Sequence, residues 1–184
     1  MPARFALPAL LLATLAAAPA HADQTDPRLP ALFTRLHAAP SHADAAPVEA
    51  EIWEIWTRSG SEPADDLMAA GALALAQQDG DRALAAFTRV TQMLPNFAEG
   101  WNKRATTLYL LGRFAESQVD IAKVLVLEPR HFGALSGLGL CALQQDRLDL
   151  AAEAFRRALE VDPAMPGVRY NLENVEAELK KRAI

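Results

Sequence analysis

The sequence predicts an all-α protein in which helical hairpins stack side by side into an α-solenoid. The first observation is a period of 34 residues, marked by Pro95, Pro129 and Pro163. The second is the helical spacing of apolar residues within each period, at steps of three and four. Self-similarity of this kind is typical of repeat architectures. Four more sets of similar residues recur at the same 34-residue interval: Gly71, Ala105 and Gly139; Ala83, Ser117 and Ala151; Phe87, Ile121 and Phe155; Val90, Val124 and Ala158.

The composition excludes several classes of protein. Of the 184 residues, 51% are hydrophobic and 22% are charged, which is too apolar for wholesale disorder. The formal net charge of -5 argues against a nucleic-acid partner, because such binding depends on neutralising phosphates with Lys and Arg. The single cysteine, Cys141, leaves no intramolecular disulfide and no cysteine-pair zinc site.

Residues 1–22 have the pattern of a secretory signal peptide. Arg4 supplies the positive charge, Phe5 to Ala18 forms a short apolar stretch, and Ala20-His21-Ala22 matches the small-x-small cleavage pattern. The stretch is shorter than the ~20 apolar residues of a membrane span. We therefore expect cleavage after Ala22, export to the bacterial periplasm and no stable membrane insertion afterwards; an uncleaved signal anchor is the alternative.

Residues 23–61 are predicted to form a pair of helices that acts as a degenerate leading repeat. The first helix carries the stripe Leu29, Leu32, Phe33 and Leu36, and the second carries Ile52, Trp53, Ile55 and Trp56. A Pro- and Ala-rich loop over 40–47 separates them. We expect Trp53 and Trp56 to pack against the first full repeat; the alternative is an exposed aromatic anchor for a partner.

Three repeat units follow, over 64–97, 98–131 and 132–165. Each unit contains two amphipathic stretches separated by a short polar break, and a proline closes the second stretch because the residue before it disfavours helical geometry. Residues 166–184 add one more stripe, made of Val168, Leu172, Val175 and Leu179, with a polar opposite face. This last segment is predicted to be a capping helix, since terminal units of a solenoid need one polar face.

The units resemble tetratricopeptide repeats (TPR) of an exported bacterial type. The third unit carries Leu138-Gly139, Ala151, Phe155, Ala158 and Asp162-Pro163 at the family's positions, and the first unit is weaker. Arg104, Ser117 and Ile121 depart from the family pattern. In the second unit the matching residues are Trp101, Ala105, Gly112, Phe114, Glu116 and Pro129. Small residues such as Gly139 let paired helices approach, and Trp101 and Phe155 fill the space between units.

The resemblance implies that the first helices line a concave groove that binds a protein or peptide partner. Asn102, Thr106 and Ser136 would hydrogen-bond the partner's backbone, and Tyr109 would offer an apolar face with a polar tip. A clamp for a terminal carboxylate is poorly supported, because most groove positions are neutral or acidic. The residues of this sequence at the family's groove positions are Asp65, Met68, Glu99, Asn102, Thr106, Tyr109, Ser136, Leu140 and Gln144. Asp65 and Glu99 favour a neutral or basic peptide.

Arg104 occupies a position that usually packs inward, and buried arginine needs a partner. Asp120, on the second helix of the same unit, is the expected partner in a structural ion pair. A direct contact between Arg104 and a ligand is the alternative.

No constellation in the sequence indicates an enzyme, a cofactor or a metal. Cys141 lies within an apolar helical stretch with no base nearby and is expected to be a buried core residue. His37 and His42 have no helical ligand spacing, and His131 is expected to hydrogen-bond a turn. The predicted function is a non-catalytic periplasmic scaffold or adaptor; the alternative is a structural, self-associating subunit of an envelope complex.

Overall fold

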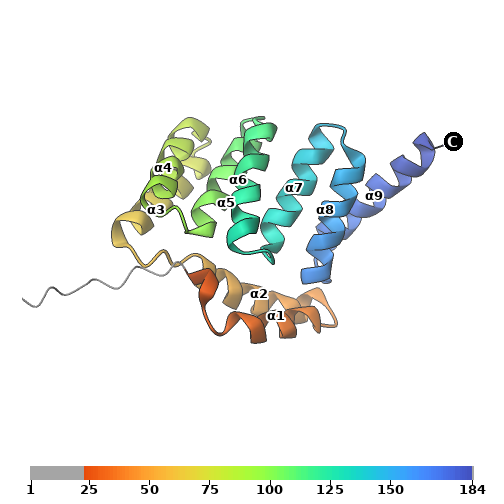
Figure 1. Ribbon diagram of the computed structural model, residues 1–184, viewed down its shortest axis with the longest axis horizontal. Helices are drawn as coiled ribbons and strands as arrows, with labels where there is room; N and C mark the ends of the chain where they lie inside the picture. The colour runs from red at the N-terminus through yellow and green to blue at the C-terminus, as the bar shows by residue number, and fades with distance from the viewer. Residues whose placement is uncertain (1–22, 184) are drawn as a thin grey trace, which may run out of the picture.

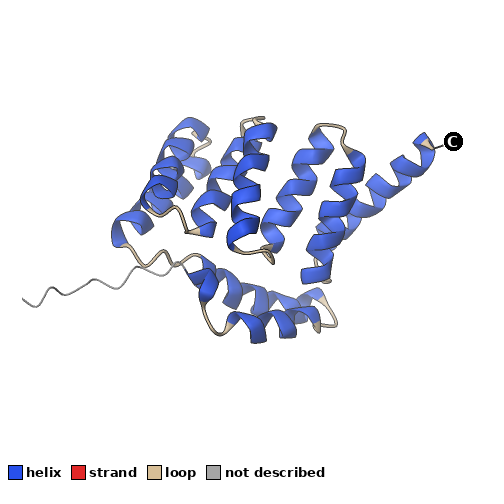
Figure 2. Cartoon of the chain, in the orientation of Figure 1, coloured by secondary structure: helices blue, strands red, loops and turns tan. Residues whose placement is uncertain are grey.

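The computed structural model describes residues 23–183, and this part of the chain is built from helices without a strand (Figures 1 and 2). The predicted signal peptide lies outside the described residues. After a short 3-10 turn over Asp23–Thr25, the elements are α1 (Leu29–His37), α2 (His42–Trp56), α3 (Glu62–Ala76), α4 (Gly80–Met93), α5 (Ala98–Leu110), α6 (Phe114–Leu127), α7 (Phe132–Gln144), α8 (Leu148–Val161) and α9 (Pro166–Arg182).

Helices α3 to α9 form a continuous stack of antiparallel hairpins that runs from left to right in Figure 1, so the predicted all-α solenoid is confirmed. The hairpins are α3 with α4, α5 with α6, and α7 with α8, and each hairpin packs mainly on its neighbours in sequence. Helix α9 covers the last hairpin through Val168 and Val175, both buried against α8. No hairpin buries its apolar face alone, so the stack is stabilised by contacts between neighbours.

Within each hairpin the two helices approach closely at a small residue. A Cβ atom added to Gly71 would lie 2.6 Å from the ring of Phe87, and one added to Gly139 would lie closer still to the ring of Phe155. In the second hairpin, Ala105 takes the place of the glycine and Ile121 takes the place of the phenylalanine. A larger residue on the first helix is therefore matched by a smaller one on the second. The structural role predicted for Gly139 and Phe155 follows from this packing.

The turn inside each hairpin repeats with the 34-residue period but changes its residue type. Gln78, Gly112 and Asp146 all have a positive φ, of 61°, 74° and 54°. The residue after each of them donates its backbone N–H to a carbonyl five residues earlier, for example from Asp79 to Ala74 at 2.9 Å, which closes the helix in a Schellman motif. Only the second turn has the glycine that this backbone conformation favours.

The amino-terminal hairpin forms, but its loop is shorter than predicted and the hairpin packs elsewhere. Helix α2 begins at His42 and contains Pro47, so most of the loop predicted over 40–47 is helical. Helices α1 and α2 lie across the ends of the repeats, below α7 and α8 in Figure 1, and not in front of α3. The rings of Trp53 and Trp56 contact His131 and Phe132. The prediction of a core role for the two tryptophans is therefore confirmed, and the prediction that they pack against the first full repeat is wrong.

The apolar area available explains this position. The exposed residues of α3 are mainly alanines and acids, with Leu73 as their one large apolar side chain, whereas Phe132, Val161 and Met165 offer larger apolar groups at the repeat ends. Two further contacts hold α1 there: His37 Nδ1 lies 2.9 Å from the carbonyl oxygen of Glu160, and the Arg130 guanidinium lies 4.1 Å from the centre of the Phe33 ring.

We expect Gln78→Gly to raise the free energy of unfolding by about 1 kcal/mol, because glycine adopts a left-handed backbone without the penalty that a side chain incurs. The matched control is Gln77→Gly, one residue earlier, where φ is -87°. The control substitution should lower stability instead, by about 0.5–1 kcal/mol. Urea denaturation followed by circular dichroism measures both changes, and equal effects at the two positions would contradict the assignment.

Candidate functional site: the concave face between α5 and α7

A cavity of about 160 Å³ opens between α5 and α7 on the side formed by the first helices of the repeats. We call it the α5–α7 pocket; it is lined by Asn102, Ala105, Thr106, Tyr109, Ser117, Ile121, Gly133, Ala134, Ser136, Gly137 and Leu140. Five of the groove residues predicted from the sequence lie together here, namely Asn102, Thr106, Tyr109, Ser136 and Leu140. A volume of this size holds one aliphatic or aromatic side chain.

The pocket exists because α7 lacks side chains on one face. Gly133 and Gly137 are four residues apart and therefore lie on the same side of the helix. A Cβ atom at Gly137 would have only Ile121 within 4 Å, at 3.5 Å, so the close packing of the fold does not require a glycine there. Sequence reasoning missed Gly137, although two glycines at this spacing are a signal that could have found it.

The floor of the pocket is apolar and its rim is polar. Ala105, Ile121 and Ala134 form the floor, and all three are buried. Among residues 23–183, neither the Tyr109 hydroxyl nor the Ser136 hydroxyl has a hydrogen-bond partner. These hydroxyl groups are therefore available to a ligand that places an apolar group on the floor.

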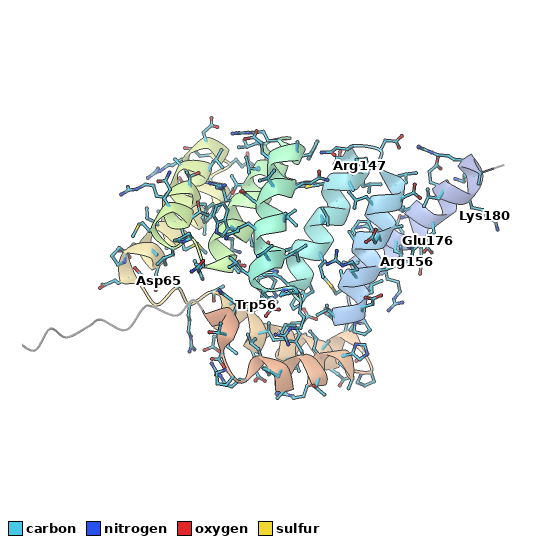
Figure 3. The ribbon with its side chains drawn as sticks, viewed as in Figure 1. Trp56, Asp65, Arg147, Arg156, Glu176 and Lys180 are labelled. Carbon is cyan, nitrogen blue, oxygen red and sulfur yellow. The ribbon has the colours of Figure 1, made fainter. Side chains whose placement is uncertain are left out.

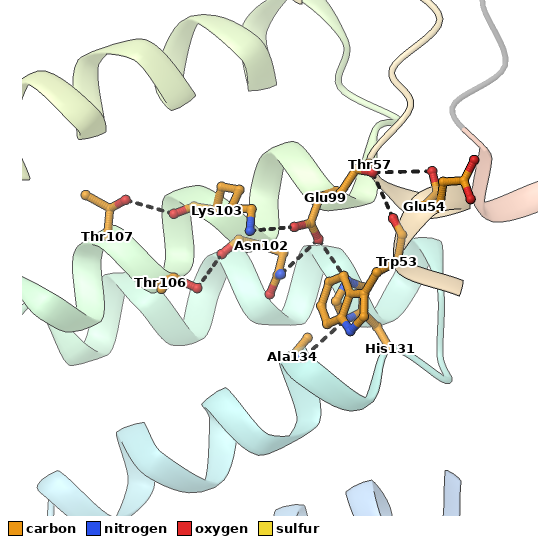
Figure 4. Close-up of polar contacts among 10 residues, drawn as sticks. All are labelled: Trp53, Glu54, Thr57, Glu99, Asn102, Lys103, Thr106, Thr107, His131 and Ala134. Carbon is orange, nitrogen blue, oxygen red and sulfur yellow. Dashed lines mark hydrogen bonds and ion pairs between the residues drawn. The ribbon is translucent and has the colours of Figure 1, made fainter. Parts of the chain in front are cut away.

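Glu99 is buried beneath the amino-terminal hairpin and is not available to a groove ligand, which corrects the expectation for this residue (Figure 4). Its Oε2 accepts hydrogen bonds from Asn102 Nδ2 at 2.9 Å and His131 Nε2 at 3.2 Å, and its Oε1 lies 3.1 Å from Lys103 Nζ. We call these four residues the Glu99 cluster. Burial opposes ionisation of Glu99, but the hydrogen bonds and the Lys103 charge outweigh it, so the pKa of Glu99 lies below its ordinary value.

His131 connects the Glu99 cluster to the backbone and to α2. Its Nδ1 accepts the backbone N–H of Ala134 at 3.2 Å and so caps α7, which leaves the proton on Nε2 for donation to Glu99. The Trp56 ring stacks on the imidazole, with centroids 4.2 Å apart and 12° between the planes. His131 thus caps the first turn of α7 and bonds Glu99, where a hydrogen bond to the turn at the repeat junction was expected, and its side chain joins three segments of the chain.

The Glu99 cluster also orients Asn102 at the edge of the pocket. The amide Nδ2 of Asn102 donates to Glu99, which leaves its Oδ1 as the acceptor for a ligand. Thr106 donates its hydroxyl to the carbonyl oxygen of Asn102 at 2.9 Å, so its oxygen lone pairs stay available to a donor.

The remaining predicted groove residues lie away from the pocket. Asp65, near the start of α3, accepts hydrogen bonds from the Ser59 hydroxyl and backbone N–H (Figure 3). Met68 is half-buried against the cores of the first repeat, next to Phe87 and Phe97. Gln144 is exposed at the last residue of α7. The structure therefore does not bring these three side chains to the pocket.

Arg104 and Asp120 form the expected ion pair. Nε and Nη2 of Arg104 each donate to one carboxylate oxygen of Asp120 at 2.6 Å, in the bidentate geometry that favours arginine. Nη1 donates to the hydroxyl of Thr91 at 3.2 Å, and the guanidinium lies 4.6 Å from the centre of the Trp101 ring. The contacts join α4, α5 and α6. Trp101 is itself held by a hydrogen bond from Nε1 to the Pro95 carbonyl at 3.0 Å.

Cys141 is buried as predicted, and its thiol donates to the Ser117 hydroxyl at 3.3 Å. Burial raises the pKa of the Cys141 thiol, which disfavours the reactive thiolate. Within the described range, residues 23–183, no group of three or more metal-ligating side chains comes together. In that range no helix is both long enough and apolar enough to cross a bilayer.

Comparisons with known proteins agree with this architecture. The tetratricopeptide repeat family model matches residues 68–126 and 111–166, together more than half of the chain. A TPR repeat-containing protein of Rhizobium etli is 34% identical over 137 residues, which cover 74% of this chain and 67% of the relative. The mouse DnaJ homolog subfamily C member 7 is 29% identical over 109 residues, 59% of this chain but only 22% of that longer protein.

Among solved structures, the first TPR domain of Spaghetti (RPAP3), bound to the HSP90 peptide SRMEEVD, superimposes with a TM-score of 0.64. Its sequence identity is 22%, and the match covers 65% of this chain and 95% of that domain. The period, the stacked hairpins and the family match lead to one conclusion. The chain belongs to the tetratricopeptide repeat family.

Replacing Asp120 by alanine should lower the free energy of unfolding by about 2–3 kcal/mol, because it leaves the Arg104 guanidinium without its bidentate partner. The estimate is below that for a fully buried pair, since the Arg104 side chain is 21% exposed. The control is Glu116→Ala on the same helix, which removes an exposed pair with Arg113 and should change stability much less. Equal destabilisation by the two variants, in urea denaturation, would argue against a structural role for Arg104.

The Glu99 cluster predicts an acid-sensitive share of stability. Because folding lowers the pKa of Glu99, ionised Glu99 stabilises the native state above the pKa of an ordinary glutamate, and this stabilisation is lost as the pH falls. Glu99→Gln should therefore be less stable than the wild type near pH 7 and lose less stability between about pH 5 and pH 3. Urea titrations followed by tryptophan fluorescence measure this, with the exposed Glu153→Gln as control. A parallel pH profile for Glu99→Gln and wild type would contradict the assignment.

Proposed function

We propose that this protein is a non-catalytic scaffold or adaptor of the bacterial periplasm, which binds a segment of a partner protein on its concave face. The observation that carries the proposal is the α5–α7 pocket, because it combines an apolar floor of side-chain size with unpaired hydroxyl groups at the rim. A bound segment would place one apolar side chain on the floor. Tyr109, Ser136 and Asn102 would then hydrogen-bond its backbone.

Peptide binding by a domain of the same fold supports this proposal. The RPAP3 domain holds its HSP90 peptide on a fold that this chain shares. Because the identity is low, the likeness supports the mode of binding and not the identity of the partner. Lys103 is already paired with Glu99, which argues against the use of its charge to hold a terminal carboxylate.

A binding role fits the side chains of the pocket better than a catalytic one. The Ser117 hydroxyl donates to the backbone carbonyl of Ala105 at 2.8 Å and accepts from Cys141, so no base activates it. Both ring nitrogens of His131 are occupied, Nε2 by Glu99 and Nδ1 by the backbone N–H of Ala134. The periplasmic part of the proposal is supported by the signal peptide pattern of residues 1–22, and fractionation of cells that express the protein tests it.

Self-association is a second candidate, because two large apolar side chains on the outer helix α6 are exposed. Val119 is 70% exposed and Val126 is 76% exposed, and they are seven residues apart on one side of the helix. Light scattering during size-exclusion chromatography separates the two roles. A stable oligomer that dissociates in Val119→Ser supports the structural role, and a monomer supports the adaptor.

The adaptor proposal is tested by filling the pocket. Gly137→Leu should abolish capture of the partner from a periplasmic extract, because the new side chain occupies the floor that the partner needs. The fold should tolerate it, since only Ile121 lies within 4 Å of the added Cβ. Tyr109→Ala should weaken capture about tenfold through loss of the rim contact.

The matched control is Ala122→Leu, which adds the same side chain on the exposed side of α6 and should capture the partner as the wild type does. Crosslinking followed by mass spectrometry identifies the captured proteins. Recovery of the same partners in equal amount by Gly137→Leu would overturn the assignment of this pocket.

A further inference from the structure

A second cavity, of about 300 Å³, continues the concave face from α7 toward α9 and α2. We call it the acidic pocket; it is lined by His42, Glu49, Ser136, Met165, Pro166, Gly167, Val168 and Asn171. Ser136 lines both this cavity and the α5–α7 pocket. A segment that occupies the first cavity can therefore extend into the second.

One carboxyl group, that of Glu49, lines the acidic pocket, and a second, that of Asp162, interacts with it without lining the cavity. Glu49 comes from α2, and behind it lies Asp162, the last residue before the proline that closes the third repeat. Asp162 is completely buried; its Oδ1 accepts the backbone N–H of Ala164 at 3.0 Å, and its side chain contacts Glu49. Asp162 Oδ2 and Glu49 Oε1 are both buried and have no hydrogen-bond partner among the described residues.

Within the described part of the chain, no permanent positive charge faces this pair. The group with a possible positive charge is His42, whose Nδ1 lies 3.7 Å from Glu49 Oε1. Arg169 of α9 donates to the backbone carbonyl of Pro163 instead. Burial raises the pKa of Glu49 and of Asp162, and the negative charge of Asp162 raises the pKa of Glu49 further. Ionisation of both groups is therefore costly in the unliganded protein.

We propose that the acidic pocket binds the positively charged side chain of a lysine or arginine carried by the partner segment, next to the apolar residue held in the α5–α7 pocket. This inference rests on the proposed peptide-binding function and adds the charge of the ligand. The cation would pair with Glu49, and the buried Asp162 next to Glu49 would add to the negative potential there. Ser136 and Asn171 offer further acceptor oxygens. The aliphatic stem of the side chain would pack on Met165 and Val168.

A long cationic side chain fits this site better than a metal ion does. The cavity of about 300 Å³ has room for a methylene chain, and Met165, Pro166 and Val168 give it an apolar lining. In residues 23–183 no set of three ligating side chains is gathered as a metal site needs. An acidic pair with no permanent positive charge beside it in this range is instead suited to bind one ammonium or guanidinium group.

The probes for the test are fluorescein-labelled nine-residue peptides of glycine and serine that contain one leucine and one lysine, separated by zero to three residues. Each has a twin in which acetyl-lysine replaces lysine and so removes the charge. Fluorescence anisotropy with the full chain near pH 8 should show that at least one lysine peptide binds about tenfold more tightly than its twin. The preference should shrink as the pH falls, because burial raises the pKa of both carboxyl groups and so favours their protonation.

Glu49→Gln and Asp162→Asn should each reduce the preference for lysine to less than about threefold. The control Glu153→Gln changes an exposed acid on α8 and should keep the full preference. Thermal unfolding distinguishes loss of the site from loss of the fold. Glu49→Gln should be at least as stable as the wild type near pH 8, because it removes repulsion between buried carboxylates.

The outcomes separate this inference from the proposed function. Equal binding of lysine and acetyl-lysine peptides, still abolished by Gly137→Leu, would overturn the acidic pocket and support the groove. A lysine preference that survives in both Glu49→Gln and Asp162→Asn would place the cation elsewhere and overturn the inference. Failure of every peptide to bind would also overturn it, and the capture experiment would then decide the adaptor proposal alone.

Discussion

The close approach of two helices within each hairpin is the constraint on which the rest of the structure depends. Gly71 and Gly139 leave no room for a side chain beside Phe87 and Phe155, so the helices of these hairpins can lie against each other with a ring between them. Their spacing sets the angle at which each hairpin meets the next, and hence the curvature of the concave face. The α5–α7 pocket lies where that curved face also lacks side chains on α7.

The amino-terminal hairpin changes what the repeats can offer to a partner. Trp56 stacks on His131, and Trp53 lies against Gly133, so this hairpin closes one end of the concave face. It buries Glu99, and it brings Glu49 next to Asp162. The two acids thus have opposite environments: Glu99 accepts two hydrogen bonds and pairs with Lys103, whereas Glu49 faces a second carboxyl group. Glu99 is a structural group, and Glu49 is a carboxyl group whose ionised form a cationic ligand would stabilise.

Much of the candidate site could be predicted because groove positions recur with the repeat. Asn102, Thr106, Tyr109, Ser136 and Leu140 meet at one pocket since each lies on the same side of a first helix. The burial of Glu99 could not be predicted in this way, because its partner His131 comes from the start of the next repeat and is itself stacked on Trp56 of α2. In the sequence, Asp162 is an ordinary repeat residue before a proline. Its unusual feature, a buried contact with Glu49 of α2, appears only in the tertiary structure.

The sequence by itself determined the helices, their pairing into hairpins and the order of the stack, because a 34-residue period and helical apolar spacing are local and repeated signals. The ion pair between Arg104 and Asp120 could also be predicted, since both residues belong to one hairpin. Only the tertiary structure decided where α1 and α2 dock, which acids they bury and where two pockets open. Those features arise from contacts between segments far apart in the chain, and neither periodicity nor helix propensity encodes such contacts.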